Sequence, residues 1–239
     1  MKDYDKSSYR TAALTSDYAP AQATCSFMNR VYLLMGAGLA LTAIVAFFVA
    51  GSPGLVKMFL GNNVMFWCMI IVEFGLVVWL SSCIEKMSAA TATAGFIAYA
   101  VVNGVTMSVI FLAFTISSIA VTFLITAGGF AGLSLFGFLT KRNLGAVGTF
   151  CLYALFGLII ASIVNIFLKS NALDWAVSIF GIIIFSGLTA YDTQKLKEIG
   201  NTALEREALG KYAVIGALNL YLDFINLFLF LLRLFGNRR

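Results

Sequence analysis

Apolar residues occupy this chain in long runs that are separated by short polar segments. A transmembrane α-helix needs about 20 apolar residues, whereas a strand of a transmembrane barrel needs about ten residues of alternating polarity. Because the runs are long and continuously apolar, they predict helices rather than a β-barrel. We place seven spans at about 28–51, 64–84, 89–113, 118–140, 146–168, 173–196 and 211–235. The third and fourth spans are separated by so few residues that we expect a tight antiparallel pair.

Composition supports an all-α integral membrane protein. Of the 239 residues, 61% are hydrophobic and 11% are charged, whereas a soluble domain carries about 25% charged residues. The spans and short loops use up the length, so we expect one membrane domain at 28–239 after a polar cytoplasmic tail at 1–27. The tail has no apolar stretch followed by a small-residue cleavage site, so we do not expect a cleaved signal peptide.

The basic residues predict an orientation, because cytoplasmic loops of membrane proteins carry an excess of Lys and Arg. With a cytoplasmic N-terminus, the inside segments hold eleven of the 16 basic residues: Lys2, Lys6, Arg10, Arg30, Lys86, Lys141, Arg142, Lys195, Lys197, Arg206 and Lys211. The outside segments hold the other five: Lys57, Lys169, Arg233, Arg238 and Arg239. The N-terminus is therefore expected inside and the C-terminus outside. The basic C-terminus opposes this orientation and leaves open a re-entrant last helix.

Several residue types exclude common enzyme sites. Histidine is absent, which excludes His-based triads and H-E-x-x-H metalloproteases. The four cysteines lack C-x-x-C spacing and are interpreted as small apolar fillers. The pairs Gly128/Gly132 and Gly36/Ala40 have four-residue spacing inside apolar spans, which favours close helix packing over a phosphate loop. We expect no enzymatic activity, no cofactor and no nucleic-acid partner.

Asp223 lies in the apolar stretch LNLYLDFINLFLFLLRLF. An ionised carboxylate at membrane depth costs at least ~2.5–3.5 kcal/mol, so such a residue normally faces a partner, a water-filled cavity or a pathway. At 100° per residue, a polar stripe within an arc of about 80° is formed by Asn219, Asp223, Asn226 and Arg233. Interhelical hydrogen bonds would account for the asparagines, but the aspartate requires compensation of its charge.

Two further carboxylates lie in other apolar spans. Asp192 lies about four residues before the basic end of the sixth span, where an interfacial pairing with Lys195 or water is the simpler alternative. Lys211 and Lys195 mark the basic ends of the seventh and sixth spans. At a rise of 1.5 Å per residue, Asp223 lies ~18 Å from Lys211, whereas Asp192 lies only ~5 Å from Lys195. Counting therefore does not place the two aspartates at the same depth. Glu73 lies mid-span, and its simpler alternative is a neutral acid bonded to a backbone carbonyl.

Four segments resemble the Bax inhibitor-1 family, also called the transmembrane Bax-inhibitor-motif family: GLSLFGFLTKRNLGAVGTF, LIIASIVNIFLK, FSGLTAYDTQKLK and LYLDFINLFLFLLRLFGNRR. The resemblance covers about 28–239 and is strongest for the bacterial inner-membrane branch. It implies six helices around a central C-terminal helix. It also implies that Asp192 and Asp223 form a hydrogen-bonded, pH-sensing pair on the cytoplasmic side of a closed pore.

The family resemblance further implies a pH-regulated calcium leak that opens when the aspartate pair breaks. Two close carboxylates do not both ionise cheaply, so they share a proton and titrate as a unit. Glu73, Asn219 and Asn226 are the candidate residues of the ion path. The resemblance also implies a latch, in which an arginine near the cytoplasmic end of the second span binds the two aspartates. This chain has Ile84 at that position. Lys86 is a possible substitute, but an ammonium group lacks the planar shape with which a guanidinium binds a carboxylate through two hydrogen bonds.

The expected function is a pH-sensitive calcium-permeable leak channel of the bacterial inner membrane. Ca²⁺ takes 6–8 oxygen ligands, and the carboxylates and amides here are too few for a tight metal site, so calcium is expected as a transient permeant ion. The alternative is a regulatory membrane protein without transport, which binds and modulates a membrane-anchored ATP-dependent protease and whose tail at 1–27 is the contacting or the degraded segment. An aspartyl hydrolase is disfavoured, because neither aspartate has a G-x-G-D context.

Overall fold

The structure is a computed structural model that describes residues 3–202 and 206–239, with side chains described over 22–202 and 207–239. Its elements are α1 (Asp3–Ala50), α2 (Pro53–Phe59), α3 (Asn63–Cys83), the 3₁₀ turn η1 (Ile84–Lys86), α4 (Ala89–Ala113), α5 (Ile116–Leu139), α6 (Gly145–Leu168), α7 (Asn171–Gly200) and α8 (Arg206–Phe235). All but α2 and η1 are long and apolar enough to cross a membrane, which confirms the seven predicted spans. The short α2 and η1 were not predicted.

Polar residues start the membrane helices at the ends of the apolar runs. The side chains of Asn62, Ser88, Thr115 and Ser170 accept hydrogen bonds from backbone N–H groups in the first turns of α3, α4, α5 and α7. The first N–H groups of a helix have no partner within it, so these caps stabilise the helix starts. The caps therefore mark where each of these four helices begins.

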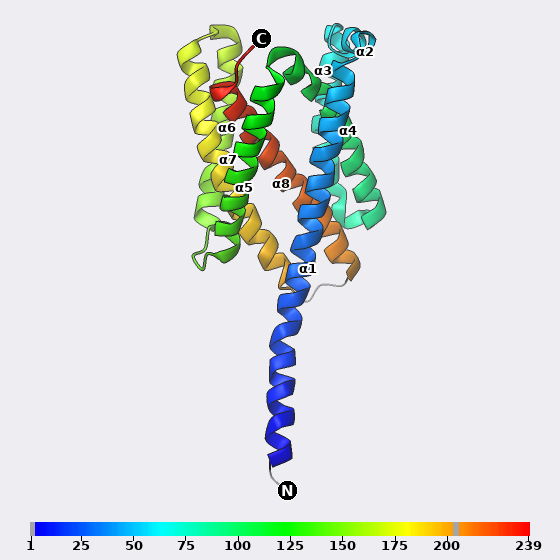
Figure 1. Ribbon diagram of the computed structural model, residues 1–239, viewed down its shortest axis with the longest axis vertical. Helices are drawn as coiled ribbons and strands as arrows, with labels where there is room; N and C mark the ends of the chain where they lie inside the picture. The colour runs from blue at the N-terminus through cyan, green and yellow to red at the C-terminus, as the bar shows by residue number, and fades with distance from the viewer. Residues whose placement is uncertain (1–2, 203–205) are drawn as a thin grey trace.

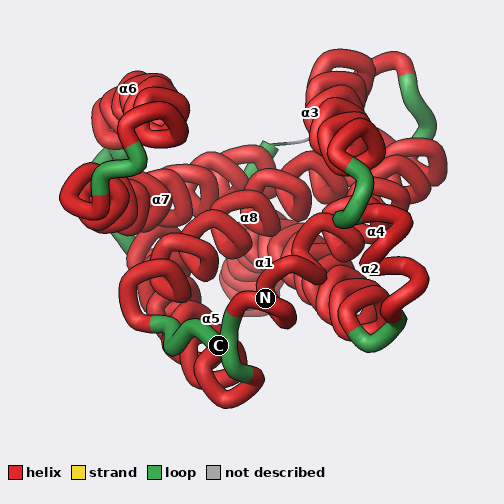
Figure 2. Tube along the Cα trace, turned by 90° about the horizontal axis from the view of Figure 1, so that it is seen from above, coloured by secondary structure: helices red, strands yellow, loops and turns green. Residues whose placement is uncertain are grey.

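The helix α8 lies at the centre of the bundle and crosses it obliquely, from the orange to the red end of the chain in Figure 1. It packs against α1, α4, α5 and α7. The outer helices α3 and α6 pack on α4 and α7 and lie at opposite edges in the view from above (Figure 2). This arrangement confirms the expected central C-terminal helix surrounded by the other six.

The two ends of α8 show that it crosses the bundle rather than re-entering it. Near its start, Lys211 Nζ donates to the Glu85 carbonyl in η1 at 3.5 Å, just before α4 begins. After its end, Thr115 N donates to the Asn237 carbonyl at 3.1 Å, just after α4 ends. Because these two contacts lie at opposite ends of α4, α8 extends from one end of α4 to the other. The re-entrant alternative is therefore wrong.

The helices α4 and α5 do not form the tight pair that their short connection predicted. They are joined only by Phe114 and Thr115, but they contact each other little beyond this turn. Instead, α5 packs on α7 and α8, and its Phe123 ring meets the rings of Phe224 and Phe228 at 5.3 and 6.1 Å. The central α8 therefore separates two helices that are neighbours in sequence.

The close packing predicted at the glycine pairs is also wrong for three positions. A β-carbon added at Gly36, Gly128 or Gly132 would meet nothing within 4 Å. Gly128 and Gly132 lie on an exposed face of α5 that no other described helix covers. At Gly137, however, a β-carbon would collide with the backbone of Ala190, so α5 and α7 approach closely there.

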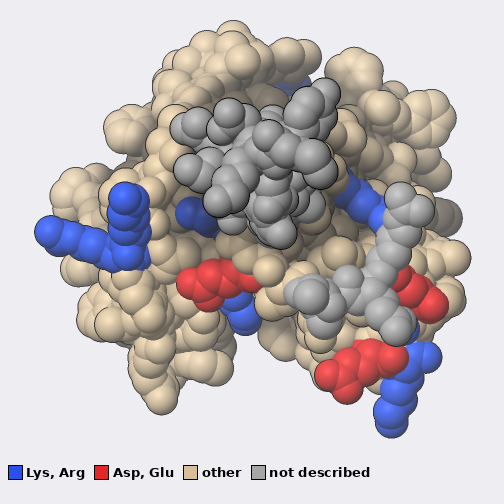
Figure 3. Space-filling model, turned by 90° about the horizontal axis from the view of Figure 1, so that it is seen from below, with Lys and Arg blue, Asp and Glu red and all other residues tan. Residues whose placement is uncertain are grey.

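Charged side chains of both signs gather in patches on the face from which α1 projects (Figure 3). The helix ends at this face carry exposed Lys86, Lys141, Arg142, Lys195, Glu198 and Glu207. The sides of the bundle expose large apolar residues instead, such as Phe156 and Phe167. This division is the one expected of a bundle whose sides face hydrocarbon and whose ends face water.

Candidate functional site

Asp223 lies inside the bundle, on the part of α8 that faces α7. Its side chain is 4% exposed, and Oδ2 has no hydrogen-bond partner among the described residues. The charged side chain that acts on it electrostatically is Asp192 of α7, which is itself half-buried. The structure therefore brings together the two aspartates that the sequence singled out, at the contact between α7 and α8.

The antiparallel packing of α7 and α8 explains why counting along the spans separated these aspartates. The two helices lie side by side, from the contact of Leu196 with Gly216 near one end to the Arg233–Asp174 ion pair at the other. Counted from the Leu196–Gly216 contact, Asp192 is four residues back along α7, about 6 Å, and Asp223 is seven residues forward along α8, about 10 Å. Both displacements run in the same direction, so the two carboxylates lie within about 4 Å of one depth. Lys195 and Lys211 were poor markers of depth, because Lys195 lies beside Leu196 and thus opposite a point on α8 that is five residues beyond Lys211.

The residues that follow Asp192 fix the end of α7 to the connection between α5 and α6. Gln194 uses both ends of its amide: Nε2 donates to the Arg142 carbonyl at 2.9 Å, and Oε1 accepts from Leu144 N at 2.8 Å. One turn further, Lys197 Nζ donates to the Phe138 carbonyl at 2.7 Å. Sequence reasoning missed both roles, although both residues stand in the segment FSGLTAYDTQKLK.

The predicted polar stripe of α8 does not act as one unit. Asn226 Nδ2 donates to the Leu222 carbonyl of its own helix at 2.8 Å. Arg233 forms an ion pair with Asp174 at the far end of α7, with 3.2 Å between Nη1 and Oδ1. Asn219 is half-buried. The roles of Asn219 and Asn226 in an ion path stay predictions.

Glu73 lies on the other side of α8 from the aspartate pair. It is half-buried on α3, and its Oε1 accepts from Thr106 Oγ1 of α4 at 2.6 Å. The partner is thus a side chain rather than the backbone carbonyl of the simpler alternative. Thr106 Oγ1 is also 2.9 Å from the Asn103 carbonyl, so Glu73 is joined to a polar cluster within α4.

Lys86 does not approach the aspartate pair in this conformation. It is exposed on η1, and the basic residue that acts electrostatically on Asp192 is Lys195. The latch therefore stays a prediction. Among the side chains that the structure describes, at 22–202 and 207–239, no three Cys, Asp or Glu residues group together in a way that would hold a metal ion.

A second set of buried polar side chains was missed by sequence reasoning. It joins three helices through Thr42 of α1, Tyr99 of α4 and Tyr221 of α8, which contact one another or Asn103. Single hydroxyl groups in apolar spans carry little sequence signal, because Thr and Tyr are common in membrane helices. The one available signal was the position of Tyr221, two residues before Asp223.

Known proteins resemble this chain over most of its length. The family model described as "Inhibitor of apoptosis-promoting Bax1" matches residues 24–239. The "Inner membrane protein YbhL" of Escherichia coli K12 is 49% identical over 216 residues, which cover 90% of this chain and 92% of the relative. A protein of Borreliella burgdorferi is 42% identical over 214 residues, covering 89% and 92%. One of Caulobacter vibrioides is 35% identical over the full length of both chains.

Proposed function

Since the chain belongs to the Bax inhibitor-1 family, we propose that it is a pH-sensitive calcium-permeable leak channel gated by Asp192 and Asp223. The seven apolar spans and the Escherichia coli relative make it a multi-pass inner-membrane protein. The observation that carries the proposal is the buried Asp223 carboxylate, which has one oxygen without a hydrogen-bond donor in the described structure.

A shared proton would supply the missing donor. A buried acceptor without a partner is costly, and the charged group beside Asp223 is another carboxylate. A proton on either carboxyl group gives the pair one donor and removes one of the two charges. Two unit charges about 4 Å apart repel by about 4 kcal/mol at an effective dielectric constant of 20. The singly protonated pair therefore holds α7 and α8 together, and the fully ionised pair pushes them apart.

The sign of the pH dependence follows from this argument. The contact is stable while the pair holds its proton and weakens as rising pH removes it. We therefore expect calcium flux to increase with pH. The ionised carboxylates would then attract a hydrated cation, and the few other oxygens nearby, such as those of Asn219 and Asn226, suit brief occupancy rather than storage.

The test is calcium flux into proteoliposomes that contain the purified protein, measured at stepped pH. Wild type should show flux that rises with pH. Asp223→Asn and Asp192→Asn should each give low flux with little pH dependence, because an amide donates a hydrogen bond and carries no charge. Asp174→Asn is the matched control, since Asp174 also lies on α7 but in an exposed ion pair. Wild type without flux, or pH dependence that survives both aspartate substitutions, would rule out the proposal.

A regulator of a membrane-anchored ATP-dependent protease is the second candidate, and the shape of α1 favours it. The helix α1 begins at Asp3, whereas its apolar span begins only at Gln22, so its first turns project well beyond the bundle (Figure 1). A deletion of residues 1–21 leaves the span intact. Loss of protease association with unchanged flux would show two separable activities. Association by a wild-type protein that has no flux would favour the regulator alone.

A further inference from the structure

Tyr221 is the largest fully buried side chain among the described residues, and its hydroxyl joins three helices. The hydroxyl of this α8 residue lies 2.7 Å from Thr42 Oγ1 of α1 and donates to Asn103 Oδ1 of α4 at 3.0 Å. Thr42 Oγ1 in turn donates to the Ala100 carbonyl of α4 at 2.9 Å. One side chain of α8 therefore contacts polar groups of both helices on that side of the bundle.

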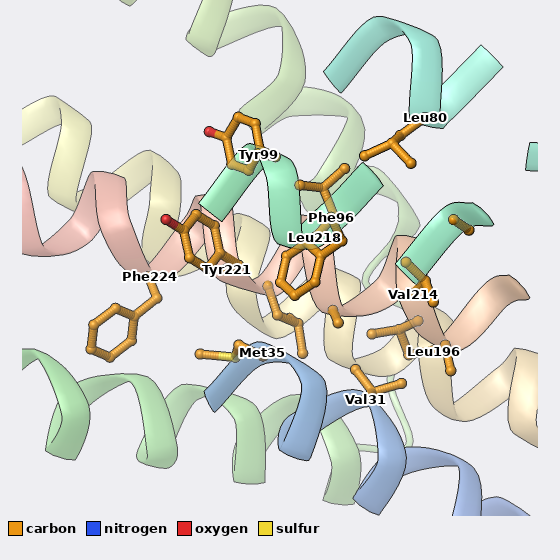
Figure 4. Close-up of a cluster of buried hydrophobic side chains, with 14 of the residues drawn as sticks. Val31, Met35, Leu80, Phe96, Tyr99, Leu196, Val214, Leu218, Tyr221 and Phe224 are labelled. Atoms are coloured by element: carbon orange, nitrogen blue, oxygen red, sulfur yellow. The ribbon is translucent and has the colours of Figure 1, made fainter. Parts of the chain in front are cut away.

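The ring of Tyr221 is held by two aromatic residues of α4. Phe96 and Tyr99 approach it edge-on, each with ring centroids 5.7 Å away (Figure 4). Across the contact, Gly38 of α1 makes room, because a β-carbon there would meet the rings of Phe96 and Tyr221. The position of the hydroxyl is thus determined by packing on both sides, and its hydrogen bonds fix the rotation of α8 about its own axis.

Tyr221 and Asp223 point to opposite sides of α8. Two residues correspond to about 200° around a helix, so the hydroxyl faces α1 and α4 while the carboxylate faces α7. A rotation or shift of α8 that breaks the Tyr221 hydrogen bonds must also move Asp223 relative to Asp192. The two contacts are therefore mechanically linked through a single rigid turn of helix.

We propose that Tyr221 is a positioning residue, which holds α8 in the register that sets Asp223 against Asp192 and thereby sets the pH at which the leak opens. This inference rests on the proposed channel function. The titratable groups that face Tyr221 are Tyr99 from α4 and Glu73 from α3. Those around Asp223 are Asp192 from α7 and Cys151 from α6, and Lys195 acts on Asp192.

The test substitution is Tyr221→Phe, which keeps the ring contacts and removes only the hydroxyl. Without its hydrogen bonds, the closed, protonated pair is less favoured, so the leak should open at lower pH. A shift of the half-maximal pH by roughly 0.5–2 units corresponds to the loss of the hydrogen bonds to Thr42 and Asn103. Maximal flux at high pH should stay within about twofold, because a neutral hydroxyl outside the pair adds no charge to the open state.

Two further variants complete the experiment. Thr42→Val removes the hydrogen-bond partner on α1 and should shift the half-maximal pH in the same direction, so it provides the test if Tyr221→Phe does not fold. Tyr153→Phe, at a 74% exposed position on α6, is the control and should leave the profile unchanged.

The outcomes separate this inference from the channel proposal. If Asp223→Asn abolishes the pH dependence but Tyr221→Phe and Thr42→Val both keep the wild-type half-maximal pH, the positioning role is wrong and the channel proposal stands. If wild type has no flux, both fail. A profile that moves to higher pH in Tyr221→Phe would also contradict the positioning role.

Discussion

Single polar side chains, rather than long ion-pair networks, connect the helices of this bundle. Gln194 binds the loop between α5 and α6 with both ends of its amide, and Tyr221 binds α1 and α4 with one hydroxyl. The Tyr221 hydroxyl lies among apolar side chains and needs these partners, because water is not available there to replace them. These residues therefore specify which helix faces meet, whereas apolar contacts alone would tolerate rotation.

The substitution Gln194→Leu should destabilise the protein measurably. It leaves the Leu144 N–H without an acceptor and the Arg142 carbonyl without a donor, at a position where the amide is buried. We expect a loss of roughly 1–3 kcal/mol, measured as a lower thermal unfolding temperature in detergent. Thr149→Val is the control, because that hydroxyl binds only its own helix at an exposed site. Equal unfolding temperatures for the two variants would contradict the account.

Two glycines of α5 should respond oppositely to alanine. A β-carbon at Gly137 would collide with the Ala190 backbone, so Gly137→Ala must push α5 away from α7, which costs about 1–3 kcal/mol. At Gly132 the space is open, and Gly132→Ala should be neutral or stabilising by up to about 1 kcal/mol, since alanine favours helix. Thermal unfolding of both variants checks this. A destabilised Gly132→Ala would show that another surface covers this face.

At the scale of elements, the C-terminal end of α8 is tied to the turn between α4 and α5. Thr115 N donates to the Asn237 carbonyl, Arg239 N donates to the Ala113 carbonyl at 3.0 Å, and the Arg238 guanidinium lies 6.0 Å from the Phe114 ring centre. These contacts hold apart two helices that the chain joins by two residues. The C-terminal residues 237–239 thus complete the packing around the end of α8.

Removal of residues 237–239 should loosen this end of the bundle. The variant loses three hydrogen bonds, including that of Asn237 N to Ser118 Oγ, and a cation–π contact, so limited proteolysis should cut the α4–α5 turn faster than in wild type. Arg233→Gln is the comparison, because it breaks an exposed ion pair worth about 0–1 kcal/mol and should change little. A truncated protein as resistant as wild type would show that the tail contributes nothing to the turn.

The sequence alone predicted the positions of the membrane spans, but it did not predict which helices pack against each other. The seven spans follow from lengths of apolar sequence, which the bilayer dictates directly. Which helix faces which depends on contacts between residues far apart in the chain, such as Gln194 with Arg142, and no local pattern encodes them. For this reason the proximity of α4 and α5 in sequence was misleading, and exposed Gly128 and Gly132 resembled a packing motif.

The residues of the candidate site were predictable from the sequence, but their arrangement in space was not. Asp223, Asp192 and Glu73 stand out because each charge in an apolar span demands an explanation. Their grouping was not predictable: Asp192 and Asp223 lie together at the contact between α7 and α8, and Glu73 binds Thr106 on another side of α8. The register of α7 against α8 is set by contacts such as that of Leu196 with Gly216, and counting along each helix alone does not contain it.

At the scale of the whole molecule, the two ends of the chain lie at opposite ends of the bundle, as seven crossings require (Figure 1). The excess of basic residues at the end from which α1 projects predicts a cytoplasmic N-terminus. Reporters active only in the cytoplasm should therefore work when fused to the N-terminus and fail at the C-terminus. Activity of the two fusions on the same side, or in the reverse order, would refute the predicted orientation.

The account as a whole depends on one proton held between two carboxyl groups in the middle of the bundle. Infrared difference spectroscopy of the purified protein during a pH change observes that proton through the C=O stretch of a protonated carboxyl group. The account predicts that wild type loses such a band as the pH rises, over the same range in which calcium flux increases, and that Asp192→Asn and Asp223→Asn each abolish it. A band that persists unchanged in both variants, or a wild-type protein without one, would contradict the shared proton.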